Sequence, residues 1–421
     1  MLLWLLDQLG HGELPSGMVG LEKITFRAAL AALASFLLAV VVGPLWIGWL
    51  RRRFREPIRG ASEAINRLHA AKDATPTMGG LFVVAALAAA MLLLGRMDSP
   101  AMVAAMIVLL GMGLLGAIDD LIKLRTRRRG MTARSKLAGQ MIVAGLAAIV
   151  LFEHHATTAD GLLMHVPLLG QFSLTTLTQG SAGAAGWVFM PLAVLVIVGS
   201  SNAVNLTDGL DGLAGGCLIF TIAAMTGIAY ASGHAELAAY LGLPRIPGAG
   251  ELAILGGAAI GAVLGFLWFN CHPAQVFLGD TGALPLGGLI GLLAVATRQE
   301  LLLLLVGGVF VAEALSVIVQ VISYKLRRRR VFLCAPLHHH FQLLGWPEGK
   351  VVVRFWIAAA LCAVVGLATL KVHVNEQAPA STGPIVDGRP AESPASATAG
   401  GRNQSTPELS ARGETSPEVI R

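Results

Sequence analysis

The sequence predicts an all-α integral membrane protein with about ten transmembrane helices. Of its 421 residues, 55% are hydrophobic and only 13% are charged, and the mean hydropathy is +0.70. Many of its apolar runs reach the length of about 20 residues that an α-helix needs to cross a bilayer. The 50 glycines fit the same class, because small residues let membrane helices approach each other closely.

Ten candidate spans follow one another along the chain. They are residues 24–50, 79–94, 101–118, 137–152, 187–204, 213–231, 252–269, 283–296, 301–324 and 351–370. Basic clusters follow the first, third and ninth spans, which places all three on one side of the membrane. An excess of Lys and Arg marks the cytoplasmic side, so ten spans would leave both termini in the periplasm. Alternating stretches at 162–166 and 171–177 predict a small outer hairpin.

The composition changes near the end of the last span. Beyond residue 372 the chain is rich in Pro, Ala, Ser, Thr, Gly and charged residues. Such a segment cannot bury enough apolar surface to fold. The predicted organisation is therefore a polytopic membrane domain, residues 1–372, followed by a disordered tail, residues 373–421.

The strongest functional signal is the stretch NAVNLTDGLDG at residues 202–212, where two apolar runs meet. Asn202, Asn205, Asp208 and Asp211 recur every three residues, so on a helix they would lean toward one side. A purely structural use of two carboxylates and two amides beside lipid is costly, which favours a functional site. The alternative is a polar loop whose Asp and Asn residues cap the adjoining helices.

Three more aspartates stand at the ends of predicted spans. Asp119 and Asp120 close the third span, where the negative end of the helix dipole disfavours carboxylates, and Lys123 is one turn away as a compensating cation. Adjacent carboxylates suit a magnesium or nucleophile site, although a snorkelling charge pair is the alternative. Asp280 lies in the glycine-flanked sequence FLGDTG, which can hold a metal against a diphosphate or be a simple turn with a helix cap.

Two further polar clusters precede or join the spans. KDATPTMGG, residues 72–80, offers a lysine, threonine hydroxyls and a glycine pair to a phosphate, but its order differs from a Walker P-loop. His338, His339 and His340 lack the spacing of a zinc site, so imidazoles that reach a phosphate or uracil are favoured over a transition-metal site, with solvated loop histidines as the alternative. All the clusters lie at the inner ends of spans, which predicts one cytoplasmic active-site cleft.

With these motifs the chain resembles the phospho-N-acetylmuramoyl-pentapeptide transferases, a branch of the polyprenyl-phosphate N-acetylhexosamine-1-phosphate transferases. The resemblance spans residues 20–370 and rests on TPTMGG (75–80), the paired aspartates (119–120), NAVNLTDGLDGLA (202–214), FNCHPAQVFLGDTGALPLGG (269–288), APLHHHF (335–341) and RFW (354–356). TPTMGG and the unbroken triple histidine favour the muramoyl branch. The resemblance implies ten helices, a cytoplasmic active site in the bacterial inner membrane, dependence on Mg²⁺ and usually a homodimer.

The resemblance also implies a reaction and its partners. Phospho-MurNAc-pentapeptide would move from UDP-MurNAc-pentapeptide to undecaprenyl phosphate in the lipid bilayer, which releases UMP and forms lipid I. No nucleic-acid partner is expected. Position by position, Asp280 resembles the magnesium ligand, Asp119 and Asp120 the paired catalytic carboxylates, and Asp208 a further catalytic acid. The positions that resemble substrate-binding residues are Lys72, Thr77, Lys123, Asn202, Asn205, Asp211, Asn270, Phe277, His338 and His339.

The chemistry of the acceptor limits what a catalytic base can contribute. A phosphate monoester is largely ionised near neutral pH because its second pKa is about 6. We therefore expect Asp119 to act as a weak base or to position the lipid phosphate, while a covalent aspartyl-phosphate route remains open.

Two other functions are compatible with parts of the sequence. A sister transferase for UDP-N-acetylglucosamine or another UDP-N-acetylhexosamine would keep the carboxylates. An ion-coupled secondary transporter would place its polar residues near the membrane midplane instead of at the span ends.

Overall fold

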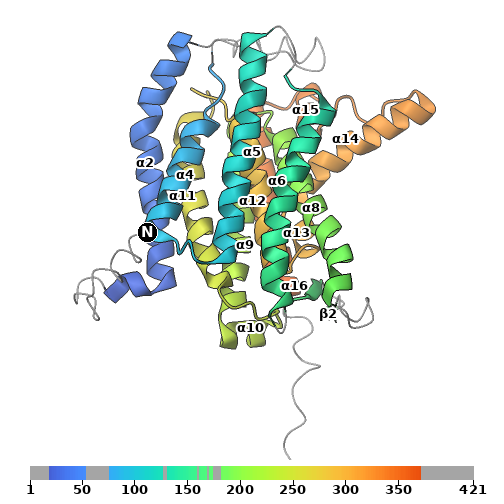
Figure 1. The fold of residues 1–421 in the computed structure, drawn as a ribbon. Helices are drawn as coiled ribbons and strands as arrows, with labels where there is room; N and C mark the ends of the chain where they lie inside the picture. The colour runs from blue at the N-terminus through green and yellow to red at the C-terminus, as the bar shows by residue number, and fades with distance from the viewer. Residues whose placement is uncertain are drawn as a thin grey trace, which may run out of the picture. The chain divides into compact units, whose positions relative to one another are not determined.

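The computed structural model describes residues 19–53, 75–126, 130–158, 161–167, 170–173 and 182–370. The predicted tail, residues 373–421, lies outside the described residues, and so does Lys72. Within the described ranges the chain is a bundle of long helices with one short β-hairpin (Figure 1).

Nine of the ten predicted spans each correspond to one helix, and the ninth corresponds to two. The long helices are α2 (Ile24–Arg53), α4 (Gly80–Leu94), α5 (Pro100–Arg125), α6 (Ala133–Ala156), α8 (Ala182–Thr207), α9 (Leu213–Gly233), α11 (Leu252–Asn270), α12 (Asp280–Ala296), α14 (Gly308–Arg327) and α16 (Glu348–Thr369). All except α4 and α12 are long and apolar enough to cross a membrane, which makes eight candidate spans in the described part of the chain. The prediction of a helical membrane protein is thereby confirmed.

Short elements connect the long helices. They are η1 (Val19–Glu22), β1 (Leu163–Val166), β2 (Gly170–Ser173), α10 (Ala235–Leu241), η3 (Ala249–Glu251), α13 (Leu302–Val306) and α15 (Leu337–Leu343). Strands β1 and β2 pair in antiparallel register, with Leu163 opposite Ser173 and Val166 opposite Gly170. This confirms the hairpin that the alternating pattern predicts.

Helix α12 is the central element of the bundle, because all of its residues are buried. Glycines on two neighbouring helices allow its first turn to approach closely. A Cβ atom on Gly116 of α5 would lie 2.2 Å from the Asp280 carbonyl oxygen, and one on Gly80 of α4 would lie 2.1 Å from the Gly282 nitrogen. Small residues at such contacts are typical of membrane helix packing. The packing therefore fixes the position at which Asp280 begins α12.

The ninth predicted span is wrong in one respect. It is not one helix over 301–324 but two, α13 and α14, which are separated at Gly307. The adjacent glycines 307 and 308 favour this break because glycine is among the weakest helix formers. Helix α14 leaves the bundle at a clear angle after the break (Figure 1). Only its first half contributes buried residues, which are Val309, Phe310, Glu313 and Ser316.

Candidate active site

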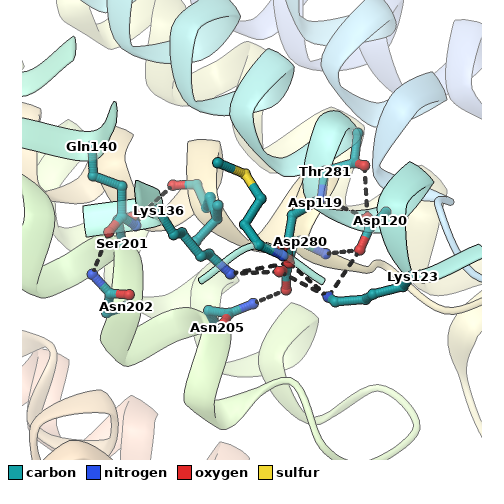
Figure 2. A network of polar contacts seen from close by, with 12 residues as sticks. Asp119, Asp120, Lys123, Lys136, Gln140, Ser201, Asn202, Asn205, Asp280 and Thr281 are labelled. Atoms are coloured by element: carbon teal, nitrogen blue, oxygen red, sulfur yellow. Dashed lines mark hydrogen bonds and ion pairs between the residues drawn. The ribbon is translucent and has the colours of Figure 1, made fainter. Parts of the chain in front are cut away.

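Three aspartates predicted from two separate motifs come together in one polar cluster (Figure 2). Asp119 and Asp120 lie in the last two turns of α5, and Asp280 is the first residue of α12. Each offers a carboxylate oxygen within 4.8 Å of the others. All three side chains are buried, so their negative charges require partners.

Two lysines neutralise most of this charge. Lys123 Nζ lies 2.9 Å from Asp119 Oδ2, 3.2 Å from Asp120 Oδ1 and 2.9 Å from Asp280 Oδ2. Lys136, from the first turn of α6, pairs with Asp280 Oδ2 and lies 3.6 Å from Asp119 Oδ2. Lys123 is among the residues predicted from the sequence, but Lys136 is not, because it follows a basic loop and is indistinguishable there from a residue that only sets topology.

The paired aspartates of α5 have different surroundings. Asp120 Oδ2 accepts hydrogen bonds from the backbone nitrogen and the hydroxyl of Thr281, at 2.9 and 2.7 Å, and Oδ1 accepts one from the Asp280 nitrogen at 3.3 Å. A carboxylate there also meets the positive end of the α12 dipole. Asp120 therefore anchors the start of α12. Asp119 accepts a hydrogen bond from the Met131 nitrogen and turns its other oxygen toward both lysines.

Amide side chains of α8 extend the polar network (Figure 2). Asn205 donates to Asp280 Oδ1 at 2.6 Å. Asn202 donates to Gln140 Oε1 at 3.0 Å, and Gln140 donates to the Ser201 hydroxyl at 3.2 Å. Asn205 thus contacts the acidic cluster directly, whereas Asn202 lies one helical turn away and is held by α6.

Residues 202–211 are helical only in their first part and do not form one continuous helical face. Helix α8 ends at Thr207, and Asp208 and Asp211 lie in the turn before α9. Gly212 has φ 77° in this turn, a left-handed conformation that glycine adopts without strain. Asp211 points away from the cluster: its Oδ2 lies 3.0 Å from His272 Nδ1 and accepts a hydrogen bond from the Ala274 nitrogen at 3.1 Å.

Asp208, in contrast, lies beside the acidic cluster. Its carboxyl group lies near the backbone of Gly279, directly before Asp280. Burial raises the pKa of Asp208 to about 7, and the negative charges of Asp280 and Asp120 add to the increase. The Asp208 carboxyl is therefore poised to change its charge near neutral pH.

The remaining predicted residues surround the cluster at greater distance. Asn270 connects two loops, because its Oδ1 accepts from the Gly212 nitrogen at 2.9 Å and its Nδ2 donates to the Val276 oxygen at 2.8 Å. The Phe277 backbone pairs with residues 76 and 79, the segment that also carries Thr77. A Cβ on Gly279 would lie 3.0 Å from the Thr77 hydroxyl.

The histidines lie on the short helix α15. His338 and His339 have ring centroids 4.2 Å apart. His338 is fully buried, whereas His339 is partly exposed and its Nδ1 lies 2.9 Å from Gln342 Oε1. The two rings thus have different surroundings despite being neighbours.

The cluster suits a divalent cation. Its donors are carboxylate oxygens, the ligands that hard cations such as Mg²⁺ prefer. Three carboxylates face two ammonium groups, Lys123 and Lys136, which leaves one excess negative charge (3 − 2 = 1). The acidic residues therefore fit a metal ion, with Asp280 and Asp119 presenting oxygens to the space that the lysine ammonium groups share.

Comparisons with known proteins agree with this arrangement. The sequence model of glycosyl transferase family 4 matches residues 100–298, a range that contains all three aspartates. The fold and the site thus define a polytopic membrane glycosyl transferase.

Curated relatives narrow the class further. Proteins named phospho-N-acetylmuramoyl-pentapeptide-transferase from Koribacter versatilis, Solidesulfovibrio magneticus and Nitratidesulfovibrio vulgaris are 45%, 44% and 45% identical to the chain. The matches cover 89%, 83% and 83% of this chain and 100%, 94% and 94% of the relatives. The chain belongs to the phospho-N-acetylmuramoyl-pentapeptide-transferase family.

Proposed function

We propose that the chain transfers phospho-MurNAc-pentapeptide from UDP-MurNAc-pentapeptide to undecaprenyl phosphate, releasing UMP and forming lipid I. The names of its relatives support this reaction. The observation that carries it in the structure is the cluster of Asp119, Asp120 and Asp280 with two lysines at the helix ends. Such a cluster combines anion-binding cations with metal-binding carboxylates, and transfer between two phosphates needs both.

The lysines bind and screen the substrates in this reaction. An oxygen of the lipid phosphate forms a bond to the β-phosphorus of the nucleotide sugar, while the bond from that phosphorus to the bridging oxygen breaks and UMP leaves. Negative charge grows on the leaving oxygen, and Lys123 and Lys136 supply fixed positive charge beside it. Asp119 orients the lipid phosphate or accepts its last proton, a small contribution because the phosphate is already largely ionised.

Magnesium is the cofactor that the site fits. Asp280 would hold the ion, with Asp119 beside it, while Asp120 keeps Asp280 in place by binding the first nitrogens of α12. A bound Mg²⁺ would neutralise the phosphate oxygens and increase the electrophilicity of phosphorus. The Asn205 amide, which donates to Asp280 Oδ1, orients that carboxylate.

We further propose ten membrane crossings, made by the eight long apolar helices together with α4 and α12. The two shorter helices are largely buried by their neighbours. They can therefore be shorter than the roughly 20 residues that a helix needs to cross the bilayer in contact with lipid. The end that carries the site also carries the basic residues that close α2, α5 and α14. This charge supports a cytoplasmic site and periplasmic termini. A location in a bacterial inner membrane is supported by the names of the relatives.

Two further features stay proposals. The family resemblance implies assembly as a homodimer, and the composition of residues 373–421 predicts a tail that activity does not require. Removal of the tail is expected to leave turnover unchanged in correctly inserted protein, and a collapse of turnover would contradict this.

Release of UMP tests the proposed function. Detergent-purified protein is supplied with undecaprenyl phosphate and Mg²⁺, and UDP-MurNAc-pentapeptide is compared with UDP-N-acetylglucosamine, with and without EDTA. EDTA-sensitive release from the muramoyl substrate alone is expected. Preference for the acetylglucosamine substrate would indicate a sister transferase, and no UMP from either substrate would favour an ion-coupled transporter.

A further inference from the structure

Glu313 is a buried carboxylate inside a candidate membrane span, and the chemistry described above does not use it. It lies in α14 with 0% of its surface exposed. Its Oε1 accepts hydrogen bonds from the backbone nitrogen of His338 at 3.1 Å and pairs with His338 Nδ1 at 3.2 Å. Ionisable residues inside membrane spans are costly and usually serve a function. The question is therefore what the pairing with His338 accomplishes.

The other side of the His338 ring faces the active-site turn. A Cβ atom on Gly209 would lie 2.3 Å from His338 Nε2 and 3.0 Å from Cε1. The ring thus occupies the space that a side chain at position 209 would need. His338 Nε2 is buried and has no hydrogen-bond partner among the described residues. The ring is packed against the backbone and not held there by a second hydrogen bond.

Gly209 directly follows Asp208, whose carboxyl group lies near Gly279 and within reach of the charges of Asp280 and Asp120. A displacement of the chain at residue 209 would move Asp208 away from the acidic cluster. A carboxylate that holds one imidazole nitrogen fixes both the orientation and the tautomer of the ring. The contacts therefore run from Glu313 through His338 and Gly209 to Asp208.

We propose that Glu313 is a positioning residue for the active site: by holding the His338 ring against Gly209, it keeps Asp208 beside Asp280. The proposal rests on the proposed function, because its readout is the rate of UMP release. His338 acts in it through the backbone of the turn. The orientation depends on one acceptor oxygen, Oε1, which both His338 donors share.

Substitutions of Glu313 separate orientation from folding. Glu313→Gln keeps an acceptor oxygen and is expected to retain most of the kcat for UMP release. Glu313→Leu loses the acceptor and is expected to lower kcat about tenfold or more. An effect of this size is within the range of coupling between contacting residues. Glu251→Gln is the matched control, since Glu251 is a buried carboxylate that pairs with Arg27 away from the acidic cluster. It should lower the melting temperature and leave kcat unchanged.

A double-mutant cycle keeps the test decisive if Glu313→Leu does not fold. Gly209→Ala forces a Cβ against the His338 ring and is expected to lower kcat about tenfold in the wild-type background. In the His338→Ala background the space beside residue 209 is free, so adding Gly209→Ala should lower kcat by less than about twofold. Additive effects would overturn the proposal. So would a folded Glu313→Leu with wild-type kcat, or equal losses in the Gln and Leu variants. An inactive wild type would instead contradict the proposed function.

Discussion

Replacement of Lys136 by methionine tests the electrostatic account of the cluster. Lys136 pairs with Asp280 Oδ2, and the two side chains are only 17% and 10% exposed. Removing one partner of a buried ion pair costs about 3 to 5 kcal/mol. Lys123 still contacts Asp280, so we expect the lower end, about 3 kcal/mol of unfolding free energy without metal. At roughly 2 °C per kcal/mol for a large chain, the melting temperature should fall by about 6 °C.

Added Mg²⁺ should reverse part of this loss. The ammonium group of Lys136 competes with a metal for Asp280 Oδ2, so its removal should strengthen Mg²⁺ binding. Because Mg²⁺ binds only the folded state at this site, it should stabilise Lys136→Met more than the wild type. Melting temperatures in detergent, measured with EDTA and with MgCl₂, provide the comparison. Lys325→Met, at the exposed end of α14, is the matched control and should change neither value. The reasoning would be refuted if Lys136→Met and the wild type melted at the same temperature in EDTA, or if Mg²⁺ raised both melting temperatures by the same amount.

Three further predictions concern the aspartates and the packing around them. Asp280→Asn should abolish Mg²⁺-dependent UMP release, and Asp119→Asn should reduce it strongly without unfolding the protein. A near-normal rate of UMP release in either variant would contradict the role proposed for that residue. Gly116→Ala places a Cβ 2.2 Å from the Asp280 oxygen and should cost about 1 to 3 kcal/mol of stability as well as turnover, so an unchanged melting temperature would speak against the close contact. The raised pKa of Asp208, about 7, means that the folded state binds its proton more tightly than the unfolded state. Stability in EDTA should therefore fall as pH rises from about 4 through 7, and Asp208→Asn should lack this fall; parallel pH profiles would contradict the assignment.

The helical spans could be predicted from sequence because bilayer thickness sets the length of an apolar run. The break at Gly307 could not be predicted from hydropathy, because the residues on both sides are apolar. The glycine pair at 307 and 308 favours a break but does not require one. The predicted end of the fifth span, residue 204, lies close to the observed end of α8 at Thr207, but the directions of Asp208 and Asp211 beyond it could not be predicted. Spacing of three residues indicates a helical face only while the helix continues, and the glycines of the DGLDG sequence end it.

The acidic residues of the site were predictable, whereas their partners were not. Asp119, Asp120 and Asp280 stand out as charges at the ends of apolar spans. Lys136 lies 144 residues from its partner Asp280, and nothing local distinguishes it from other basic residues. Glu313 could have been found from the sequence, since it is a lone carboxylate inside the ninth predicted span.

The most direct test of the central claim is metal binding at Asp280. Mn²⁺ can replace Mg²⁺ at oxygen sites, and its binding to the detergent-solubilised protein is read from the loss of the free-ion electron paramagnetic resonance signal. The wild type should bind Mn²⁺, and Mg²⁺ should displace it. Asp280→Asn should lose this binding while remaining folded in EDTA, with a melting temperature lowered to an extent similar to that of Lys136→Met because the same buried ion pair is lost. Undiminished, Mg²⁺-displaceable binding of Mn²⁺ by Asp280→Asn would contradict the assignment of the acidic cluster as the metal centre.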